Sequence, residues 1–306
     1  MTSRPAPIKP VATRRPACFE VQENLCPVRN RIKCMDAVDG MRALPDNCIP
    51  LIVTSPPYDS IRSYGGHLWD FEKFMLLARE LWRVAMPGGI VCWNVQDQIV
   101  RGDQTGSGFM QVSYFKRLGF RLHNTLIVEK QVCRGTSRNR YGVAPEFVFV
   151  LSKGRPRTVD LIRDKANKYA GRMMRFSART KDGQISHTKQ VLIKPYGVRP
   201  HVWRYTSGSR ATATDRYAFE HPALMPELLA RDLILSWSRP LDVVLDPLAG
   251  AATTCKMALL MDRYYLGFEV HEPYHRLAER RLSDALMEYR RRLLDLSECD
   301  RSATNS

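Results

Sequence analysis

The sequence predicts an α/β fold built around an open β-sheet. Apolar runs of strand length alternate along the chain with segments whose apolar residues recur at helical spacing. Polar residues follow directly after several of these runs, and open α/β sheets bind their ligands at the carboxyl ends of the strands. Near the C-terminus, one run leads through a turn of small residues into a helix, a geometry that brings backbone N–H groups against a charged ligand. We therefore expect a binding site at one edge of the sheet.

The composition indicates a basic protein with a polyanionic partner. The 306 residues include 47 Lys or Arg and 31 Asp or Glu, a net charge of +16 that makes nucleic acid the first candidate. No apolar run reaches the length of a membrane span and no hydrophobic signal core is visible, so we expect a cytoplasmic, nucleoid-associated protein. The eight cysteines include no Cys-x-x-Cys, which indicates neither a zinc knuckle nor a disulfide framework. Residues 1–29 hold five prolines and five Lys or Arg, as expected of a flexible basic arm.

The apolar run at residues 49–53 reads as a buried strand and leads into the motif Thr54-Ser55-Pro56-Pro57-Tyr58. Each proline fixes its own φ and lacks an N–H, so the carbonyls of this loop have few local donors and can receive an amino group. The aromatic face of Tyr58 suits a planar amine such as a nucleobase. Taken alone, the motif fits a proline-rich turn with a core tyrosine equally well.

The segments around this motif follow the α/β alternation. A short strand ends at Asp36 and a helix runs to Leu44, which places Asp36 at the same sheet edge as Thr54. Residues 59–67 are polar and contain glycine, as expected of a mobile loop over the site. Helices are predicted at 71–85 and 109–118, and strands at 90–95, 122–129 and 147–151.

The segment at residues 153–205 differs in composition from the rest of the chain. It carries 14 Lys or Arg against three Asp, and its aromatic residues include Trp203 and Tyr205. This mixture favours a module that reads nucleic acid, and the alternative is a solvated basic insertion. The candidate DNA contacts, two of which lie in the preceding loop at 130–144, are Arg134, Arg138, Arg155, Arg157, Arg172, Arg175, Lys194 and Arg199.

The alternation resumes at Pro222 with a helix through Ile234 and a strand that ends at Asp246. After the turn of small residues and its helix comes a strand that ends at Glu269, 23 residues beyond Asp246. This spacing is close to the one at which a carboxylate holds ribose hydroxyls in dinucleotide-type folds. No Gly-Lys-Ser/Thr follows the turn, which counts against a phosphate-binding NTPase loop, and a last helix is predicted at residues 273–294.

Taken together, the motif at 54–58 and the turn at 246–254 resemble those of the permuted β class of DNA amino-methyltransferases. In that family a Ser/Asp-Pro-Pro-Tyr motif precedes the target-recognition region, and Asp-Pro-Phe-x-Gly-x-Gly-Thr follows near the C-terminus. Further matches are Met86-Pro87-Gly88-Gly89, Pro145-Glu146-Phe147, His221-Pro222-Ala223 and Phe268-Glu269. The resemblance implies a circularly permuted, Rossmann-like methyltransferase sheet, mostly parallel with one antiparallel hairpin and a small basic target-recognition insertion. The implied organisation is a catalytic half at 30–152, a recognition region at 153–205, a cofactor half at 206–296 and a tail at 297–306.

The resemblance also implies the chemistry. Ser55, Pro56, Pro57 and Tyr58 would hold the amine of a base flipped out of double-stranded DNA. S-adenosylmethionine, which leaves as S-adenosylhomocysteine, would be bound by Asp36, Thr54, Asp246, Pro247, Leu248, Gly250, Thr253 and Glu269. Leu248 and Ala252 depart from the Phe and second Gly of the family motif, so a lost aromatic surface and an added methyl would both affect cofactor binding.

Ser at the first motif position is more typical of cytosine-N4 enzymes and Asp of adenine-N6 enzymes, so cytosine N4 is the first expectation and adenine N6 the alternative. Two other classes remain open. One is a non-enzymatic DNA-binding protein with a decayed cofactor site, and the other is a methyltransferase acting on RNA or protein amides. A cognate restriction endonuclease is a candidate partner, and the sequence leaves monomer and homodimer equally open.

Overall fold

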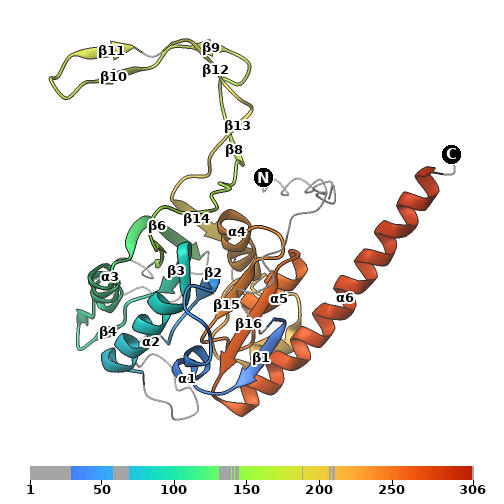
Figure 1. The fold of residues 1–306 in the computed structure, drawn as a ribbon. Coiled ribbons are helices and arrows are strands. Elements are labelled where there is room, and N and C mark those ends of the chain that lie inside the picture. Colours follow the sequence, from blue (N-terminus) through green and yellow to red (C-terminus); the bar gives the residue numbers. More distant parts are fainter. Residues whose placement is uncertain are drawn as a thin grey trace.

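The computed structural model describes residues 29–57, 69–130, 139, 141, 145–187, 189–206, 208 and 211–304. Within these residues the predicted α/β fold is confirmed, with an eight-stranded sheet in the order β1-β16-β15-β2-β3-β7-β6-β14 (Figure 1). The strands are β1 (Arg31–Cys34), β2 (Ile49–Thr54), β3 (Ala85–Val95), β6 (Arg121–Lys130), β7 (Glu146–Ser152), β14 (Val202–Tyr205), β15 (Val243–Asp246) and β16 (Tyr264–Glu269).

The sheet is mostly parallel, as predicted. β7 runs antiparallel to both of its neighbours, β3 and β6, and with β6 it forms the expected antiparallel hairpin. The permuted order is visible in the pairing of β15 with β2, where Val244 lies opposite Leu51. The strand that ends at Asp246 therefore comes late in the chain but lies beside the strand that leads to Ser55. The carboxyl ends of the two strands meet at one edge of the sheet.

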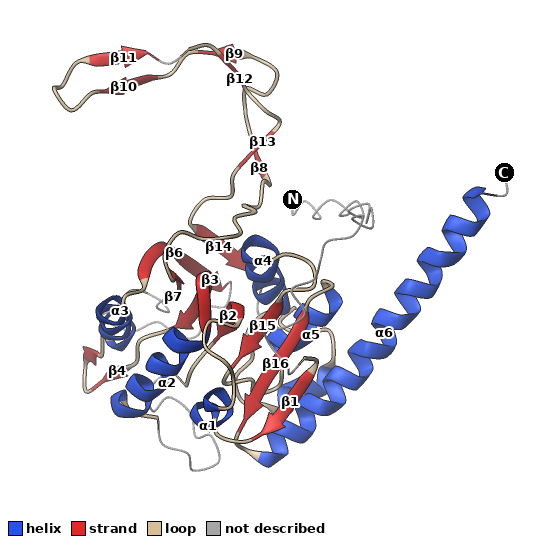
Figure 2. Cartoon of the chain, in the orientation of Figure 1, coloured by secondary structure: helices blue, strands red, loops and turns tan. Residues whose placement is uncertain are grey.

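Helices cover both faces of the sheet (Figure 2). One face carries α1 (Ala37–Arg42), α2 (Phe71–Val84) and α3 (Ser107–Leu118), and the other carries α4 (Glu227–Trp237), α5 (Thr253–Leu260) and the first part of α6 (Glu272–Thr304). A short 3-10 helix, η1 (Arg216–Glu220), precedes α4. Successive side chains of a strand point to opposite faces of the sheet, so each strand contributes to both hydrophobic cores. Val53 packs in the core under α4, and its neighbour Ile52 packs in the core under α2.

The last helix is longer than the sequence predicted. α6 was expected to end at residue 294 and to leave a tail from 297, but it continues to Thr304. No Gly or Pro follows Pro273 in this stretch, so nothing in the sequence stops the helix. Its C-terminal part extends away from the sheet (Figure 1).

The basic region contains a long antiparallel hairpin at residues 165–197, called here the basic hairpin. Its nested strand pairs are β8 (Lys165–Ala166) with β13 (Tyr196–Gly197), β9 (Met173–Met174) with β12 (Val191–Leu192), and β10 (Ser177–Arg179) with β11 (Ile185–His187). It projects from the body of the protein (Figure 1), and none of its described residues is buried. A second small hairpin pairs β4 (Ile99–Val100) with β5 (Asp103–Gln104).

The boundary predicted for the recognition region needs a correction. It was placed at residue 205, but Val202–Tyr205 forms β14, the edge strand of the central sheet, which pairs in parallel with β6. Trp203 and Tyr205, which the sequence assigned to nucleic-acid reading, are buried in the core under α4. Their alternation with exposed residues is the usual pattern of an edge strand that covers one core.

Candidate functional site

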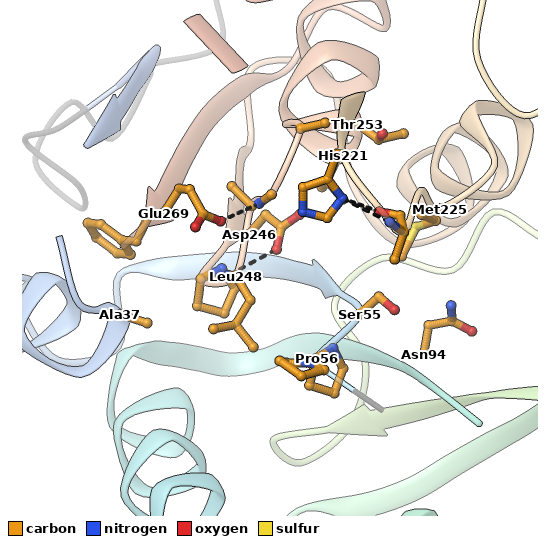
Figure 3. A pocket seen from close by; sticks show the side chains of 18 of the residues that line it. Ala37, Ser55, Pro56, Asn94, His221, Met225, Asp246, Leu248, Thr253 and Glu269 are labelled. Carbon is orange, nitrogen blue, oxygen red and sulfur yellow. Dashed lines mark hydrogen bonds between the residues drawn. The ribbon is translucent and has the colours of Figure 1, made fainter. Parts of the chain in front are cut away.

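A cavity of about 940 Å³ lies along the carboxyl edge of the sheet. Figure 3 shows residues from both halves of the chain around it, with Ser55, Pro56 and Asn94 on one side and Asp246, Leu248 and Glu269 on the other. The motif at 55–57 and the turn after β15 thus open into one space, although 190 or so residues separate them in the sequence. The volume lies in the range of pockets that bind drug-sized ligands, about 300–1,000 Å³.

The turn after β15 has a left-handed backbone at two positions. Gly250 has a φ of +51°, and Ala252 has φ 57° and ψ 36°. A Cβ at Gly250 would lie 2.9 Å from Nε2 of His221, so glycine is required there for space as well as for conformation. The αL conformation costs an alanine about 1–2 kcal/mol. Burial of the Ala252 methyl, which is fully inaccessible, offsets about 0.8 kcal/mol of this.

Glu269 closes the turn from the neighbouring strand. Its Oε2 accepts a hydrogen bond from the backbone N–H of Gly250 at 2.8 Å, and its Oε1 accepts one from the N–H of His271 at 2.9 Å (Figure 3 shows the first). A carboxylate oxygen has more than one lone pair and can accept more than one hydrogen bond. The arrangement holds the carboxylate at the cavity wall in a fixed orientation.

Asp246 is a buried carboxylate on the same wall. Oδ1 accepts from the hydroxyl of Thr54 at 2.7 Å and from the backbone N–H of Leu248 at 3.2 Å. Burial raises the pKa of Asp246 to about 6, because removal from water disfavours the charged form more than these hydrogen bonds favour it. A cation placed in the cavity would favour the carboxylate and lower this pKa again.

A cluster of buried charges supports the turn from behind. The Arg281 guanidinium, which is completely inaccessible, donates to the backbone oxygen of Ala251 at 2.5 Å and to the Thr253 hydroxyl at 3.1 Å. The same side chain pairs with Glu227 at 2.9 Å, and Lys256 pairs with Glu227 at 2.7 Å. Asp215 completes the cluster by pairing with both cations, and these charges hold its pKa below the usual range. The turn is thus fixed by α6 as well as by its own backbone.

The structure places most of the predicted site residues around the cavity. Those that line it are Asp36, Ser55, Pro56, Pro57, Asp246, Pro247, Leu248, Gly250, Thr253 and Glu269. Asp36 also caps α1, since its side chain accepts from the backbone N–H of Val38 at 2.8 Å. Thr54 is a correction, because it is fully buried and reaches the site only through its bond to Asp246. Tyr58 and the predicted loop at 59–67 lie outside the described residues.

The predicted DNA contacts fall into three groups. Arg172, Arg175 and Lys194 are exposed on the basic hairpin. Arg134 and Arg138 lie outside the described part of the chain, as does the predicted arm at its N-terminus, apart from Arg29. The remaining three lie outside the basic hairpin: Arg155 and Arg157 precede it in the chain, and Arg199 follows it.

Arg199 is a correction to the expected DNA contacts. Its guanidinium binds Asp164 at 2.5 Å and the buried Asp232 of α4 at 2.7 Å, and Tyr205 donates to the same Asp232 carboxylate at 3.0 Å. A cation held between two carboxylates anchors the base of the hairpin to the body instead of facing a phosphate.

Arg155 and Arg157 are also unsuited to the expected role. They follow Ser152, which pairs with Ile90 in the middle of β3. The backbone N–H of Arg157 donates to the carbonyl of Gly88, nearer the amino end of β3, whereas the cavity lies at the carboxyl end of the strand. Arg157 in addition pairs with Asp242 at 3.2 Å. We therefore do not retain either as a contact near the target base.

The sequence did not single out three cavity-lining residues, Asn94, Glu146 and His221, as site candidates. Asn94 ends an apolar run and Glu146 begins one, so a polar residue at the end of a buried strand was the available signal. His221 accepts a backbone hydrogen bond from Ala223 and packs on Tyr274, with ring centroids 4.4 Å apart.

Comparison with known proteins decides the family. A family model described as DNA methylase matches residues 49–280, and an orphan methyltransferase of Bacillus amyloliquefaciens, M.BamHII, is 44% identical over 249 residues, covering 80% of this chain and 93% of that one. The chain belongs to this family of DNA amino-methyltransferases. S-adenosylmethionine is the cofactor of these methyltransferases, so the methyl donor expected from the sequence motifs agrees with the family.

Solved structures share the fold of this DNA methylase. The cytosine-N4-specific PvuII DNA methyltransferase is similar with a TM-score of 0.59 at 17% identity, covering 86% of this chain and 92% of that one. A DNA modification methylase of Thermus thermophilus, TTHA0409, solved with S-adenosyl-L-methionine, has a TM-score of 0.54 at 22% identity and covers 84% and 95%. Among the described residues of our chain, no helix is long and apolar enough to cross a membrane, and no cluster of His, Cys, Asp or Glu could hold a metal ion.

Proposed function

We propose that this DNA methyltransferase transfers a methyl group to the exocyclic amine of a base in double-stranded DNA, with cytosine N4 as the first target. The observation that carries the proposal is the single cavity that joins the Ser55-Pro56-Pro57 loop to the turn after Asp246. A methyl donor bound at the turn and an amine bound at the loop would share one enclosed space. Ser55 at the first motif position favours cytosine over adenine, by resemblance to the cytosine-N4 enzymes.

The residues around the turn fit S-adenosylmethionine. The fixed carboxylate of Glu269 would accept hydrogen bonds from the ribose hydroxyls, and Asp246 would balance the positive charge of the methionine portion. Gly250 lets the backbone approach a ligand closely. Asp36 lines the same cavity and would accept a hydrogen bond from the adenine amine of the cofactor. When bound, the cofactor supplies an electrophilic methyl group on a sulfonium.

The chain's own residues would activate the amine. The lone pair of an exocyclic amine is delocalised into the ring, which makes the nitrogen a poor nucleophile. Ser55 and the Pro56 carbonyl would accept its two hydrogens and favour a more tetrahedral nitrogen, and fixed alignment in the cavity would supply the rest through proximity. Ser55 is too weak a base to remove the proton, which would leave to solvent. Tyr58 would stack on the flipped base.

The basic hairpin is the proposed DNA-contacting element. Its residues carry eight Lys or Arg and one Asp, and Tyr169, Phe176 and Tyr196 are exposed between them. A two-stranded ribbon fits the major groove of B-DNA, which is about 12 Å wide. From the hairpin, β14 leads the chain back to the cavity wall at Gly208 and Thr212. Contact with DNA and access to the base would thus come from one continuous segment.

The test of the proposed function is the nucleoside content of DNA from a methylation-free host that expresses the protein. We expect N4-methylcytosine by mass spectrometry. N6-methyladenine in its place would support the alternative target. Unmodified DNA, together with no S-adenosylmethionine binding by calorimetry, would favour the non-enzymatic DNA-binding protein. Methyl incorporation into RNA and not into duplex DNA would contradict the assignment to DNA. A cognate endonuclease and the oligomeric state are separate questions for pull-down and sedimentation.

The pKa of Asp246 predicts how cofactor affinity depends on pH. In the absence of ligand, the folded chain holds a proton on Asp246 up to about pH 6, above the unfolded value near 4, so this carboxyl stabilises the fold at low pH and the contribution is lost as the pH rises through 6. A cationic ligand favours the ionised form. S-adenosylmethionine should therefore bind up to about tenfold more tightly at pH 7 than at pH 5, and its binding at pH 5 should release close to one proton.

Calorimetry in buffers of different ionisation enthalpy measures both the affinity and the proton release. Thr54→Val removes a hydrogen bond that favours the carboxylate, so it should move the affinity profile to higher pH. This shift separates Asp246 from the other ionisable groups of the cavity wall. An affinity that stays constant from pH 5 to 7, or a profile that Thr54→Val leaves in place, would show that Asp246 does not face the cofactor's charge.

A further inference from the structure

The small hairpin of β4 and β5 lies close to the cavity because of the direction of β3. Trp93 of β3 pairs with Thr54 of β2, so the carboxyl end of β3 lies beside Ser55. Gln96, the first residue after β3, lines the cavity. Arg101, in the turn of the hairpin, is five residues further on, so at about 3.6 Å per extended residue it lies no more than about 18 Å from Gln96.

The hairpin ends in a tight turn. Val100 pairs with Asp103, and the two residues between them have φ of +51° at Arg101 and +81° at Gly102. A left-handed backbone at both central positions is characteristic of a type I′ turn, whose twist matches that of the two strands. A turn of this kind holds the end of the hairpin in one conformation.

A buried carboxylate anchors the base of the hairpin to α3. Asp97 is 6% exposed, and its Oδ1 accepts a hydrogen bond at 2.9 Å from the backbone N–H of Gly108, at the start of α3. Its Oδ2 accepts one from the Gln104 amide at 3.2 Å. The backbone N–H of Thr105 donates to the carbonyl of Gln98 at 2.9 Å and closes the base. The hairpin is thus fixed to the body, and Figure 1 shows β4 at the margin of the body near α3.

The end of the hairpin exposes two apolar side chains and a cation. Ile99 is 50% exposed, Val100 is 44% exposed, and Arg101 is exposed beside them; these three residues are called here the hairpin tip. Next to the hairpin, in the first turn of α3, Phe109 and Met110 are each 52% exposed. Exposed apolar side chains that gather in one place are typical of an interaction surface.

The position and the chemistry of the tip both favour DNA as its partner. A flipped base stays attached to its strand, so the duplex that it leaves must lie against the edge of the cavity that receives it. Extrusion of a base leaves a gap in the stack, and apolar side chains wedge into opened base steps in many protein–DNA complexes. A cation next to such a wedge meets the phosphates of the same step. The hairpin tip combines an apolar end with one cation.

We propose that the hairpin tip is a wedge that enters the DNA at the target step and occupies the space left by the flipped base. The inference rests on the proposed function, in which the target base is flipped into the cavity. Ile99 and Val100 pack against the bases on either side of the gap, and Arg101 binds a phosphate beside it. The tip offsets part of the free energy of opening the base pair and takes no part in methyl transfer itself.

The test starts from a variant of the tip that keeps the hairpin folded. The tip variant carries Ile99→Thr, Val100→Thr and Arg101→Asn. Threonine keeps the β-branched shape that suits a strand, and the turn acquires Asn-Gly, the preferred sequence of a type I′ turn. Tm should therefore be the same as in the wild type or higher, and S-adenosylmethionine affinity should be unchanged.

Two substrates then separate opening of the base pair from DNA contact in general. Duplexes carrying the methylated site are prepared with the target base normally paired or placed opposite an abasic site. On the paired duplex the tip variant should lose roughly 10- to 100-fold in kcat/KM, because opening of the pair is no longer offset. On the abasic duplex the loss should stay below about fivefold, because no base pair has to be opened.

Leu241→Asn combined with Arg117→Gln is the matched control. Leu241 is a 54% exposed apolar residue with a left-handed φ of 67°, just before the amino end of β15. Arg117 is an exposed cation in the last turn of α3. Both lie at the end of the sheet opposite the cavity, so kcat/KM on either duplex should stay within about twofold of the wild type.

Three results would overturn the inference. A tip variant that methylates the paired duplex as fast as the wild type would show that the tip does not enter the DNA. An equal loss on the two duplexes would make the tip a general DNA contact. Sedimentation in which the wild type is a dimer and the tip variant a monomer would assign the surface to a second copy of the chain. Absence of methylation by the wild type on every duplex would instead contradict the proposed function, so the two kinds of failure are distinguishable.

Discussion

Gly250→Ala is expected to lower the affinity for S-adenosylmethionine roughly 10- to 100-fold. An alanine at this position would have to adopt a φ of +51°, at a cost of about 1–2 kcal/mol. Its Cβ would lie 2.9 Å from Nε2 of His221. The His221 ring has little room to retreat, because it is tied to the backbone of Ala223 and packs on Tyr274. Overpacking of this kind costs about 1–3 kcal/mol more. The turn would relieve it by moving away from Glu269, which loosens the carboxylate proposed to bind the ribose.

Titration calorimetry and thermal unfolding of the two proteins measure this effect, and Gly102→Ala is the matched control. Gly102 has a φ of +81° in the turn between β4 and β5, and a Cβ there would meet nothing within 4 Å. It carries the same kind of backbone strain without the clash, so Tm should fall by a few degrees while cofactor affinity stays unchanged. Equal cofactor affinity in the wild type and in Gly250→Ala would contradict the role assigned to this turn.

Sequence reasoning succeeded where the signal is local. The strand, turn and helix around Asp246 follow from an apolar run, small residues and a new helical period, all within about 20 positions. The strand before Ser55 is recognisable in the same way, and the fold class follows once the family order of the two motifs is known. The structure adds the register that turns these segments into one cavity, with Val244 opposite Leu51.

The sequence failed where a residue's partner is distant in the chain. Arg199 looked like one more cation in a basic segment, but Asp232 of α4 neutralises it across the base of the hairpin. The burial of Trp203 and Tyr205 was also missed, because a four-residue edge strand is too short for its alternation of buried and exposed residues to be recognised within a basic segment. Charge counting found the recognition segment but could not separate its exposed cations from its structural ones.

Removal of the basic hairpin is expected to abolish methylation of DNA while leaving the methyltransferase body intact. Residues 167–195 can be replaced by Asn-Gly, because Ala166 and Tyr196 are directly paired and a two-residue turn of this type closes such a pair. The deletion removes seven Lys or Arg and one Asp. If most of these cations face phosphates, DNA affinity should fall roughly 10²- to 10⁴-fold at physiological salt, and the dependence of log Kd on log salt concentration should become shallower by about 3 to 6.

The body should tolerate this deletion because none of the described residues in the removed segment is buried, while Arg199, Asp232 and β14 remain in place. Tm and S-adenosylmethionine affinity should therefore match those of the wild type. Fluorescence anisotropy with duplex DNA measures the expected loss of DNA binding in the same protein. A full-length variant with Arg172, Arg175 and Lys194 changed to Gln keeps the hairpin's shape and should reproduce part of the loss, mainly as a smaller salt dependence. Wild-type DNA affinity in the shortened protein would place the DNA on another surface, whereas unchanged affinity in the triple Gln variant alone would assign the contact to the other cations and the exposed aromatic residues of the hairpin.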